Sequence, residues 1–411
     1  MIDIDEAYRR VFANIEPIDT VEVVLDDSLH RTLARSIQCD LDHPPFDRSV
    51  MDGYAVRAAD VAGAPVTLRV TGQIAAETWV DDPAGGHAWA PGDAMQINTG
   101  APIPRGADAV VRVELTEPVG GGELPEQVLI RNPVEPGTFI TRRATYGSAG
   151  QTVLQAGTLM TPAAIGAAAA AGASRVTVYR KPTVALLSTG GELVEIDCVP
   201  RGAQIRNSNQ HQLHALVLSA HAEPAPMGIV PDDRQELRES IKAALRHDVL
   251  CITGGVSMGA FDFVPEVLEQ CGARFHIQKM AIKPGRPIQF ATTDDGTLIF
   301  ALPGNPVSAF VGFELLVRPA LAALQGRTGR IPKPIQAQLR GALSATRDRR
   351  AYVPARVEIS DDGLCVVEPL SWRGSGDAFG LAGANAMIVR PPNVANAENG
   401  QTVSILLLDR V

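Results

Sequence analysis

The segment from Thr183 to about Gln325 places the strongest constraint on the fold, because strand-like and helix-like patterns alternate along it. The apolar runs typical of buried strands are TVALLST, APMGIV, VLCIT and TLIFAL. The helical stretches between and after them are NSNQHQLHALVLSAH, DDRQELRESIKAALRH, FVPEVLEQCG and PVSAFVGFELLVRPALAAL. Near-continuous apolar strands that alternate with helices predict a parallel sheet covered on both faces, which is a doubly wound α/β domain.

The regions on either side of this segment show a different pattern. From Arg57 to about Thr141, short Val/Thr/Ile runs alternate with Pro/Gly turns, which predicts a small β unit. After Gly326 the pattern is again that of strands and turns. The chain has 411 residues, and single cores rarely grow beyond roughly 250–300 residues, so several domains are expected.

Composition and charge exclude several classes of protein. The net charge of −9 argues against non-specific binding to nucleic acid or to an anionic membrane. The N-terminus lacks the layout of a secretory signal, and the longest small-apolar run is shorter than the ~20 residues that cross a bilayer. The five cysteines are scattered without a C-x-x-C pair. We therefore expect a cytoplasmic protein with reduced thiols and with neither nucleic acid nor membrane as a partner.

Three glycine-containing loops follow strands of the predicted sheet: STGGEL, TGGVSMG and LPGNPVSA. Ligands of open α/β sheets bind beyond the carboxyl ends of the strands, where glycines let backbone amides approach an anion. None of the loops is a Walker A or G-x-G-x-x-G motif. A single Gly-Gly after a strand is more often a turn, but three such loops in one sheet favour a shared anion site. In the third loop Asn305 is expected to cap a helix that begins at Pro306.

Charged residues accompany these loops. They are Glu192, Asp232, Asp233, Asp262, Lys283 and Arg286. Carboxylates together with cations suit a phosphate or oxyanion ligand that is partly neutralised by a divalent metal, usually Mg²⁺. The alternative is structural, with Asp233 a helix cap and Lys283 a solvated lysine.

The stretch PPFDRSVMDGYAV, from Pro44 to Val56, has neither a helical nor a strand period. Its two prolines disfavour a helix, yet it gathers charged and aromatic side chains. A loop that only connects two elements does not need such residues.

Six strings, in this order, are similar to those of the molybdopterin molybdenumtransferase family, which includes the E domain of gephyrin. They are PPFDRSVMDGYAV, INTGAPIPRGADAVV, LLSTGGEL, ITGGVSMGAFDF, AIKPGRPIQF and ALPGNPVSAF. The resemblance spans essentially the whole chain. It implies a discontinuous helical linker domain, an inserted β domain, an α/β molybdopterin-binding domain and a C-terminal β-barrel-like domain. The expected bounds are 1–42 with 142–178, then 43–141, 179–326 and 327–411.

The resemblance also implies an activity and partners. Family members act in molybdenum cofactor biosynthesis, where they insert molybdate into adenylylated molybdopterin, hydrolyse the adenylate and release AMP with the help of a divalent cation, Mg²⁺. They are homodimers. The molybdopterin adenylyltransferase and molybdoenzyme apoproteins are further candidate partners.

Matched position by position, the family's motifs imply the residues of the site. The implied catalytic residues are Asp52, Glu192, Asp262 and Lys283. The implied cofactor-binding residues are Thr99, Gly190, Gly254, Gly255, Ser257, Arg286, Pro303, Gly304, Asn305, Pro306, Arg350 and Ser375. The implied metal ligands are Glu192, Asp232 and Asp262, with Asp233 the alternative to Asp232.

The sequence departs from the family at three places. Gly191 stands where an acidic residue is usual, and Arg286 stands where lysine is common. The acidic R-x-x-G-x-D stretch is replaced by RRATYGSAG, Arg142 to Gly150. A catalytically weakened paralogue that serves as a molybdopterin-binding or scaffold protein is therefore the alternative function. An adenylyltransferase is a third hypothesis, and the DGYAV loop and two β domains argue against it, since that enzyme is essentially the α/β domain alone.

Overall fold

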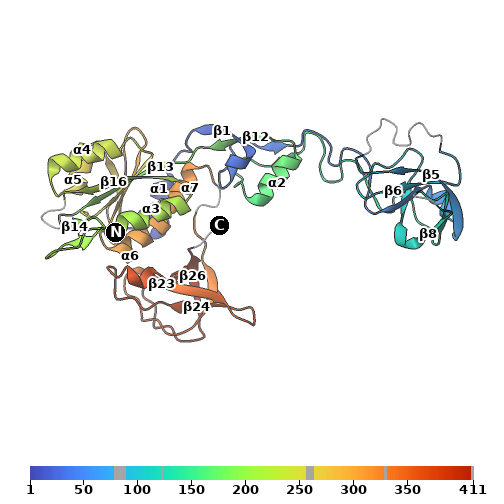
Figure 1. The fold of residues 1–411 in the computed structure, drawn as a ribbon. Helices are drawn as coiled ribbons and strands as arrows, with labels where there is room; N and C mark the ends of the chain where they lie inside the picture. Colours follow the sequence, from blue (N-terminus) through green and yellow to red (C-terminus); the bar gives the residue numbers. More distant parts are fainter. Residues whose placement is uncertain (78–88, 122–123, 256–262, 328–330, 409–411) are drawn as a thin grey trace.

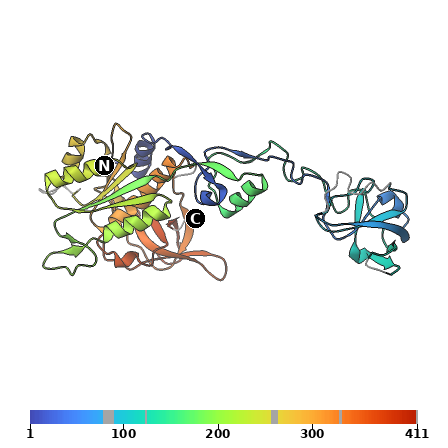
Figure 2. The same ribbon diagram turned by 45° about the horizontal axis from the view of Figure 1, so that its top comes forward.

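The computed structural model describes residues 1–77, 89–121, 124–255, 263–327 and 331–408. These residues form an elongated molecule (Figure 1). An α/β domain and a C-terminal β barrel lie together at one end, and an N-terminal β unit lies at the other, with a narrow linker between them (Figures 1 and 2).

The α/β domain is built on a mixed sheet. Its strand order is β16 (Glu223–Val230), β13 (Thr183–Thr189), β17 (Val249–Thr253), β21 (Leu298–Leu302), β20 (Gln289–Thr292) and β18 (Arg274–Ile277). The first four strands are parallel, which confirms the doubly wound fold class. Strand β20 runs antiparallel to both of its neighbours, β21 and β18, so the sheet is not parallel throughout. The cause is a short turn between β20 and β21, because parallel neighbours need a long crossover.

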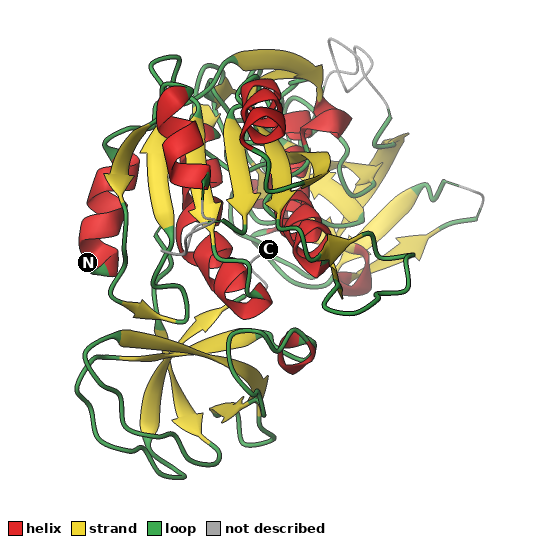
Figure 3. Cartoon of the chain, turned by 90° about the vertical axis from the view of Figure 1, so that its left-hand side faces the viewer, coloured by secondary structure: helices red, strands yellow, loops and turns green. Residues whose placement is uncertain are grey.

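Helices cover both faces of this sheet (Figure 3). One face carries α1 (Ile4–Phe12), α3 (Ser208–Ser219) and a continuous helix made of α6 (Pro306–Gly312), the π-helical η4 (Phe313–Val317) and α7 (Arg318–Leu324). The other face carries α4 (Arg234–Ala244) and α5 (Val264–Gln270). Within the described parts of the chain, Pro306–Leu324 is the one helix apolar and long enough to span a membrane, and it is mostly buried in this core.

The linker consists of segments from two distant parts of the chain. It pairs β1 (Thr20–Val24) with β12 (Arg175–Tyr179), β2 (Ile37–Gln38) with β11 (Thr152–Leu154) and β3 (Arg48–Ser49) with β10 (Ile140–Thr141). The 3₁₀ helix η1 (Leu25–Ser28) and α2 (Pro162–Ala170) pack beside them. Thr161 caps α2, and its hydroxyl accepts a hydrogen bond from the amide of Ala164 at 3.2 Å. The chain therefore runs to the N-terminal β unit and back along the same linker.

The N-terminal β unit has one six-stranded sheet. Its order is β7 (Ala109–Arg112), β4 (Gly53–Val56), β6 (Asp93–Ile97), β5 (Val66–Ile74), β9 (Gln127–Ile130) and β8 (Thr116–Val119), with 3₁₀ turns η2 (Ala58–Val61) and η3 (Val113–Leu115). Strand β4 follows directly on the PPFDRSVMD stretch and is buried along its length. The loop is therefore fixed to the sheet.

The C-terminal β barrel closes on itself. Strands β23 (Arg350–Ile359), β24 (Cys365–Pro369), β22 (Ile335–Leu339), β26 (Thr402–Leu407) and β25 (Ala386–Arg390) follow one another, and β25 pairs back to β23. This confirms the barrel-like expectation. Strand β19 (Ile282–Lys283), which comes from the α/β domain, adds to β23. The barrel is therefore joined to the α/β domain by backbone hydrogen bonds.

Candidate functional site

Asp232 closes the loop that follows β13. Its Oδ1 accepts a hydrogen bond from the hydroxyl of Thr189 at 3.0 Å, and its Oδ2 accepts one from the amide of Gly191 at 3.1 Å. The neighbouring Asp233 instead caps α4, accepting from the amides of Gln235 and Glu236 at 2.9 and 3.0 Å. The two acidic residues therefore have different tasks, and Asp232 is the one that faces the glycine loop.

Glu192 lies over the same loop. Gly190 has φ +150°, and a Cβ at that position would come within 2.7 Å of a carboxylate oxygen of Glu192. The side chain of Glu192 is exposed. The loop thus presents a carboxylate beside backbone that only glycine can form.

The second glycine loop lies against the first and the third. Gly254 has φ +91°, and a Cβ there would come within 2.1 Å of the Thr189 carbonyl oxygen. A Cβ on Gly304 would lie 3.7 Å from the Cα of Gly254. Gly255, at φ +59°, packs against Val264 of α5. The three loops therefore meet at the carboxyl edge of the sheet.

A buried polar network underlies this edge. Thr253 donates to the hydroxyl of Ser188 at 3.2 Å, and Ser188 donates to Asn207 at 3.1 Å. Asn207 caps α3, and Asn209 donates to the carbonyl of Gly304 at 2.7 Å. These two asparagines were missed in the sequence, although the string NSN between a strand-like and a helical run was a visible signal.

The third loop meets the C-terminal barrel. As expected, α6 begins at Pro306 with Asn305 at its N-cap position, but the side chain of Asn305 makes no cap hydrogen bond. The amide of Val307 instead donates to the carbonyl of Ser375 at 3.0 Å. A contact from the barrel thus replaces the local cap and brings Ser375 to Pro306, while Pro303 is buried beneath the loop.

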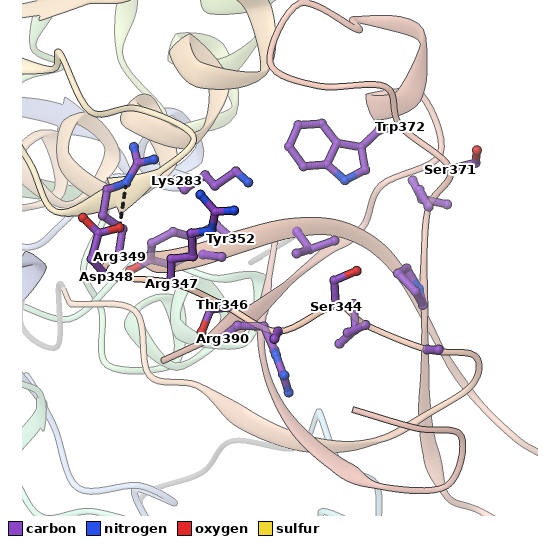
Figure 4. Close-up of a pocket in the computed structure, with 17 residues that line it drawn as sticks. Lys283, Ser344, Thr346, Arg347, Asp348, Arg349, Tyr352, Ser371, Trp372 and Arg390 are labelled. Carbon is purple, nitrogen blue, oxygen red and sulfur yellow. Dashed lines mark ion pairs between the residues drawn. The ribbon is translucent and has the colours of Figure 1, made fainter. Parts of the chain in front are cut away.

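The KPGRP segment lies between the α/β domain and the barrel. Lys283 pairs through its backbone with Ala351, and its exposed side chain enters a cavity of about 820 Å³ (Figure 4). Arg350 is 3.6 Å from Asp5 and bonds to Tyr352, whose pKa burial raises to about 12. The backbone carbonyl of Arg286 accepts from Met280, and its side chain is exposed. Of these three cations, Lys283 lines the cavity.

Asp52 and Thr99 are bound to each other in the N-terminal β unit. The amide and the hydroxyl of Thr99 both donate to Asp52 Oδ1, at 2.6 and 3.0 Å. These bonds lower the pKa of Asp52, the backbone bond most. Because the β unit and the α/β domain lie at opposite ends of the molecule, one chain does not bring Asp52 to Glu192 or Lys283 (Figure 1).

The segment that replaces the acidic stretch holds the PPFDRS loop. Arg142 pairs with Asp47 at 2.6 Å, and the amide of Arg143 donates to the same carboxylate at 2.8 Å. Arg143 also pairs with Asp42 at 2.5 Å. Burial acts to raise the pKa of Asp47, but the bonds from Arg143 and Arg142 hold it below its usual value. The arginines therefore have a structural role here.

The expected metal site remains a prediction. Ser257 and Asp262 lie outside the described residues. Within the described ranges, no group of three or more His, Cys, Asp or Glu side chains forms a metal-binding cluster. Glu192 and Asp232 remain as two neighbouring carboxylates, which suits a Mg²⁺ that keeps several ligands from water and substrate phosphate.

Family comparisons agree with the fold along the whole chain. Residues 2–172 match the MoeA N-terminal region (domains I and II), 185–323 match the probable molybdopterin-binding domain, and 336–408 match the MoeA C-terminal region (domain IV). The chain is 33% identical to the molybdopterin molybdenumtransferase of Staphylococcus aureus strain MSSA476, covering 99% of this chain and 96% of that one. It is 36% identical to that of Bacillus subtilis strain 168, covering 99% and 94%.

A solved structure gives the same result. The molybdopterin biosynthesis MoeA protein of Pyrococcus horikoshii superposes with a TM-score of 0.81 at 30% identity, covering 99% of each chain. The fold, the order of the domains and the full-length similarity agree, and the chain therefore belongs to the molybdopterin molybdenumtransferase family.

Proposed function

We propose that this protein inserts molybdenum from molybdate into adenylylated molybdopterin. In the accompanying hydrolysis, water adds to the phosphoanhydride bond between the adenylate and the molybdopterin phosphate, and AMP leaves. The observation that carries this proposal is the meeting of the three glycine loops at the carboxyl edge of the sheet, where Asp232 closes the first loop. Backbone amides and cations at such an edge suit a phosphate-bearing substrate.

The residues at this edge take separate roles. The amides of the glycine loops and the side chains of Lys283 and Arg286 would neutralise the phosphates and the molybdate. Glu192 would ligate a Mg²⁺ that also binds phosphate oxygens, lowering the charge of the reacting group. Asp232 would ligate the same Mg²⁺ while keeping its two hydrogen bonds to the loop, because its carboxylate oxygens have lone pairs left for the metal.

We further propose that the working site is shared between two subunits of a homodimer. Asp52 and Thr99 belong to family motifs in the N-terminal β unit, which lies at the far end of the molecule from the α/β domain (Figure 2). A two-fold dimer of elongated chains would bring the β unit of one subunit to the α/β domain of the other.

A complementation experiment tests the shared site. Asp52→Ala and Glu192→Ala are prepared separately, shown to be inactive and mixed under conditions of subunit exchange. Half of the dimers are then mixed, and each regenerates one intact site of two, so activity recovers to about a quarter of wild type. Exchange without recovery would mean that both residues serve one chain's site.

The second candidate is a molybdopterin-binding scaffold without turnover. It is favoured by the segment from Arg142 to Gly150, where arginines bonded to Asp42 and Asp47 occupy the place of the family's acidic stretch. The deciding assay incubates the protein with adenylylated molybdopterin, molybdate and Mg²⁺ and follows AMP. Release that requires both molybdate and the cation supports the transferase, and binding without release supports the scaffold.

The proposed setting is the cytoplasm, since all five cysteines are free thiols, as expected in a reducing compartment. The proposed partners are the adenylyltransferase that supplies the substrate and the molybdoenzyme apoproteins that receive the product.

A further inference from the structure

The cavity beside Lys283 has the size and lining of a small-ligand pocket (Figure 4). Its volume of about 820 Å³ falls within the range of roughly 300–1,000 Å³ that such pockets have. Its apolar lining residues are Leu343, Val353, Leu370, Tyr352 and Trp372, and its hydroxyl-bearing ones are Ser344, Thr346 and Ser371. The space therefore suits a ligand with a flat, largely apolar part.

Positive charge dominates the described lining. Lys283, Arg347, Arg349 and Arg390 line the cavity, and Asp348 is the one carboxylate among the lining residues. Asp348 lies 3.8 Å from Arg349, so within the cavity Lys283 and Arg347 have no carboxylate to offset them. A ligand that fits must also carry negative charge.

Trp372 is held in place at the wall of this cavity. Asp377 closes the loop that follows it, accepting from the amides of Arg373 at 2.9 Å and Gly380 at 3.0 Å. Gly380 packs so closely that a Cβ there would come within 2.7 Å of the Trp372 Cβ. The indole, which also packs on the apolar core, extends over the same opening that Lys283 and Arg347 enter (Figure 4). A ring fixed in advance loses little conformational entropy when a ligand binds.

The loop of Trp372 also touches the glycine-loop edge. Ser375, three residues further on, accepts the hydrogen bond from Val307 at the start of α6. A ligand lying on Trp372 therefore borders the edge where the phosphate chemistry is proposed.

We propose that Trp372 is the platform on which a fused heteroaromatic ring of the substrate stacks, while Lys283 and Arg347 bind the phosphate of the same substrate. The proposal rests on the proposed function and deepens it, because adenylylated molybdopterin carries two such rings, adenine and the pterin. Either ring presents the π face that an indole accepts.

Intrinsic fluorescence measures this contact directly. The other two tryptophans of the sequence, Trp79 and Trp89, belong to the N-terminal segment. Titration with AMP, adenosine and 6-hydroxymethylpterin should quench the Trp372 emission, and Trp372→Phe should remove that part of the signal. Calorimetry of Trp372→Ala should show Kd raised roughly 5- to 100-fold for the ring that stacks. Quenching by AMP alone assigns adenine, and quenching by the pterin alone assigns the pterin.

Controls separate the ring contact from its surroundings. Phe379 is 93% exposed on the same loop and is outside the cavity lining, so Phe379→Ala should leave Kd unchanged. Arg347→Ala should weaken AMP but not adenosine. If Trp372→Ala lowers the melting temperature, the test uses Trp372→Leu instead, because leucine retains more apolar packing volume than alanine and has no π face.

Two results would overturn the proposal: wild-type Kd for every probe in a folded Trp372 variant, or no binding of any probe to the wild-type protein. Its failure is distinct from that of the proposed function. If AMP is released and KM is the same in the wild type and the Trp372 variants, the stacking proposal is refuted and the transferase function is supported. If binding depends on Trp372 but no AMP is released, the stacking proposal is supported and the transferase function is refuted.

Discussion

Replacing each of two adjacent aspartates by alanine separates loop closure from helix capping. Asp232→Ala removes two hydrogen bonds that hold the loop after β13, those from Thr189 and Gly191. At an exposed site these bonds contribute together about 1–2 kcal/mol, which changes the population of the closed loop by roughly 5- to 30-fold. On the proposal that substrate binds only the closed loop, kcat/KM for AMP release should fall by up to about that factor.

Asp233→Ala is the matched control. It removes the cap of α4, which costs about 0.5–2 kcal/mol of global stability. Its melting temperature should therefore fall while its kcat/KM stays near that of wild type. The measurements are AMP release and thermal unfolding on both variants. Unchanged kcat/KM in Asp232→Ala, together with a loss in Asp233→Ala, would refute the assignment of these two carboxylates.

Two further substitutions test the packing and the charges around the sheet. Gly254→Ala would force a Cβ to 2.1 Å from the Thr189 carbonyl oxygen, so urea unfolding should show a large loss of unfolding free energy. The control is Gly296→Ala, because Gly296 has a similar φ of +86° but open space around it, and its loss should be much smaller. Equal losses in the two variants would contradict the close contact. Asp248 is partly buried; burial raises its pKa, but bonds from Arg180 and others lower it overall. A folded pKa below the unfolded one gives stability that is present at neutral pH and lost as the pH falls below about 4. Asp248→Asn should thus cost about 2 kcal/mol at pH 7 and progressively less as the pH falls below about 4, as measured by denaturant unfolding. A loss independent of pH would show that the charge is not the cause.

The α/β domain was predictable from sequence because its signals are local. A strand buried on both faces must be apolar throughout, and a loop that turns with positive φ needs glycine, so β13 and Gly254 both leave a direct trace in the sequence. Strands β18 and β20 were not predicted, and the antiparallel direction of β20 depends on its connections and not on the residues within the strand. Likewise, nothing in the pattern of α1 indicated that it would pack on the α/β core.

The parts of the candidate site that sequence did not predict depend on contacts between distant segments. Asn305 has the residue type and position of a cap, but the carbonyl of Ser375, distant in the chain, takes the amide of Val307 instead. Trp372 is an aromatic residue in a turn-rich β region, which is no signal by itself. It meets Lys283 only because the barrel closes and β19 joins it.

The length of the molecule gives the strongest argument about how the enzyme works. The loop that carries Asp52 is fixed on both sides, by β4 and by the ion pairs of Arg142 and Arg143, so it cannot fold back over the linker by local rearrangement. The paired ribbons of the linker are short and leave that loop at the opposite end from Glu192 (Figure 1). On the shared-site proposal, a chain that keeps both sets of motif residues and holds them apart would use them together with a second copy. Subunit exchange between single-site variants is therefore the experiment that bears most directly on the mechanism.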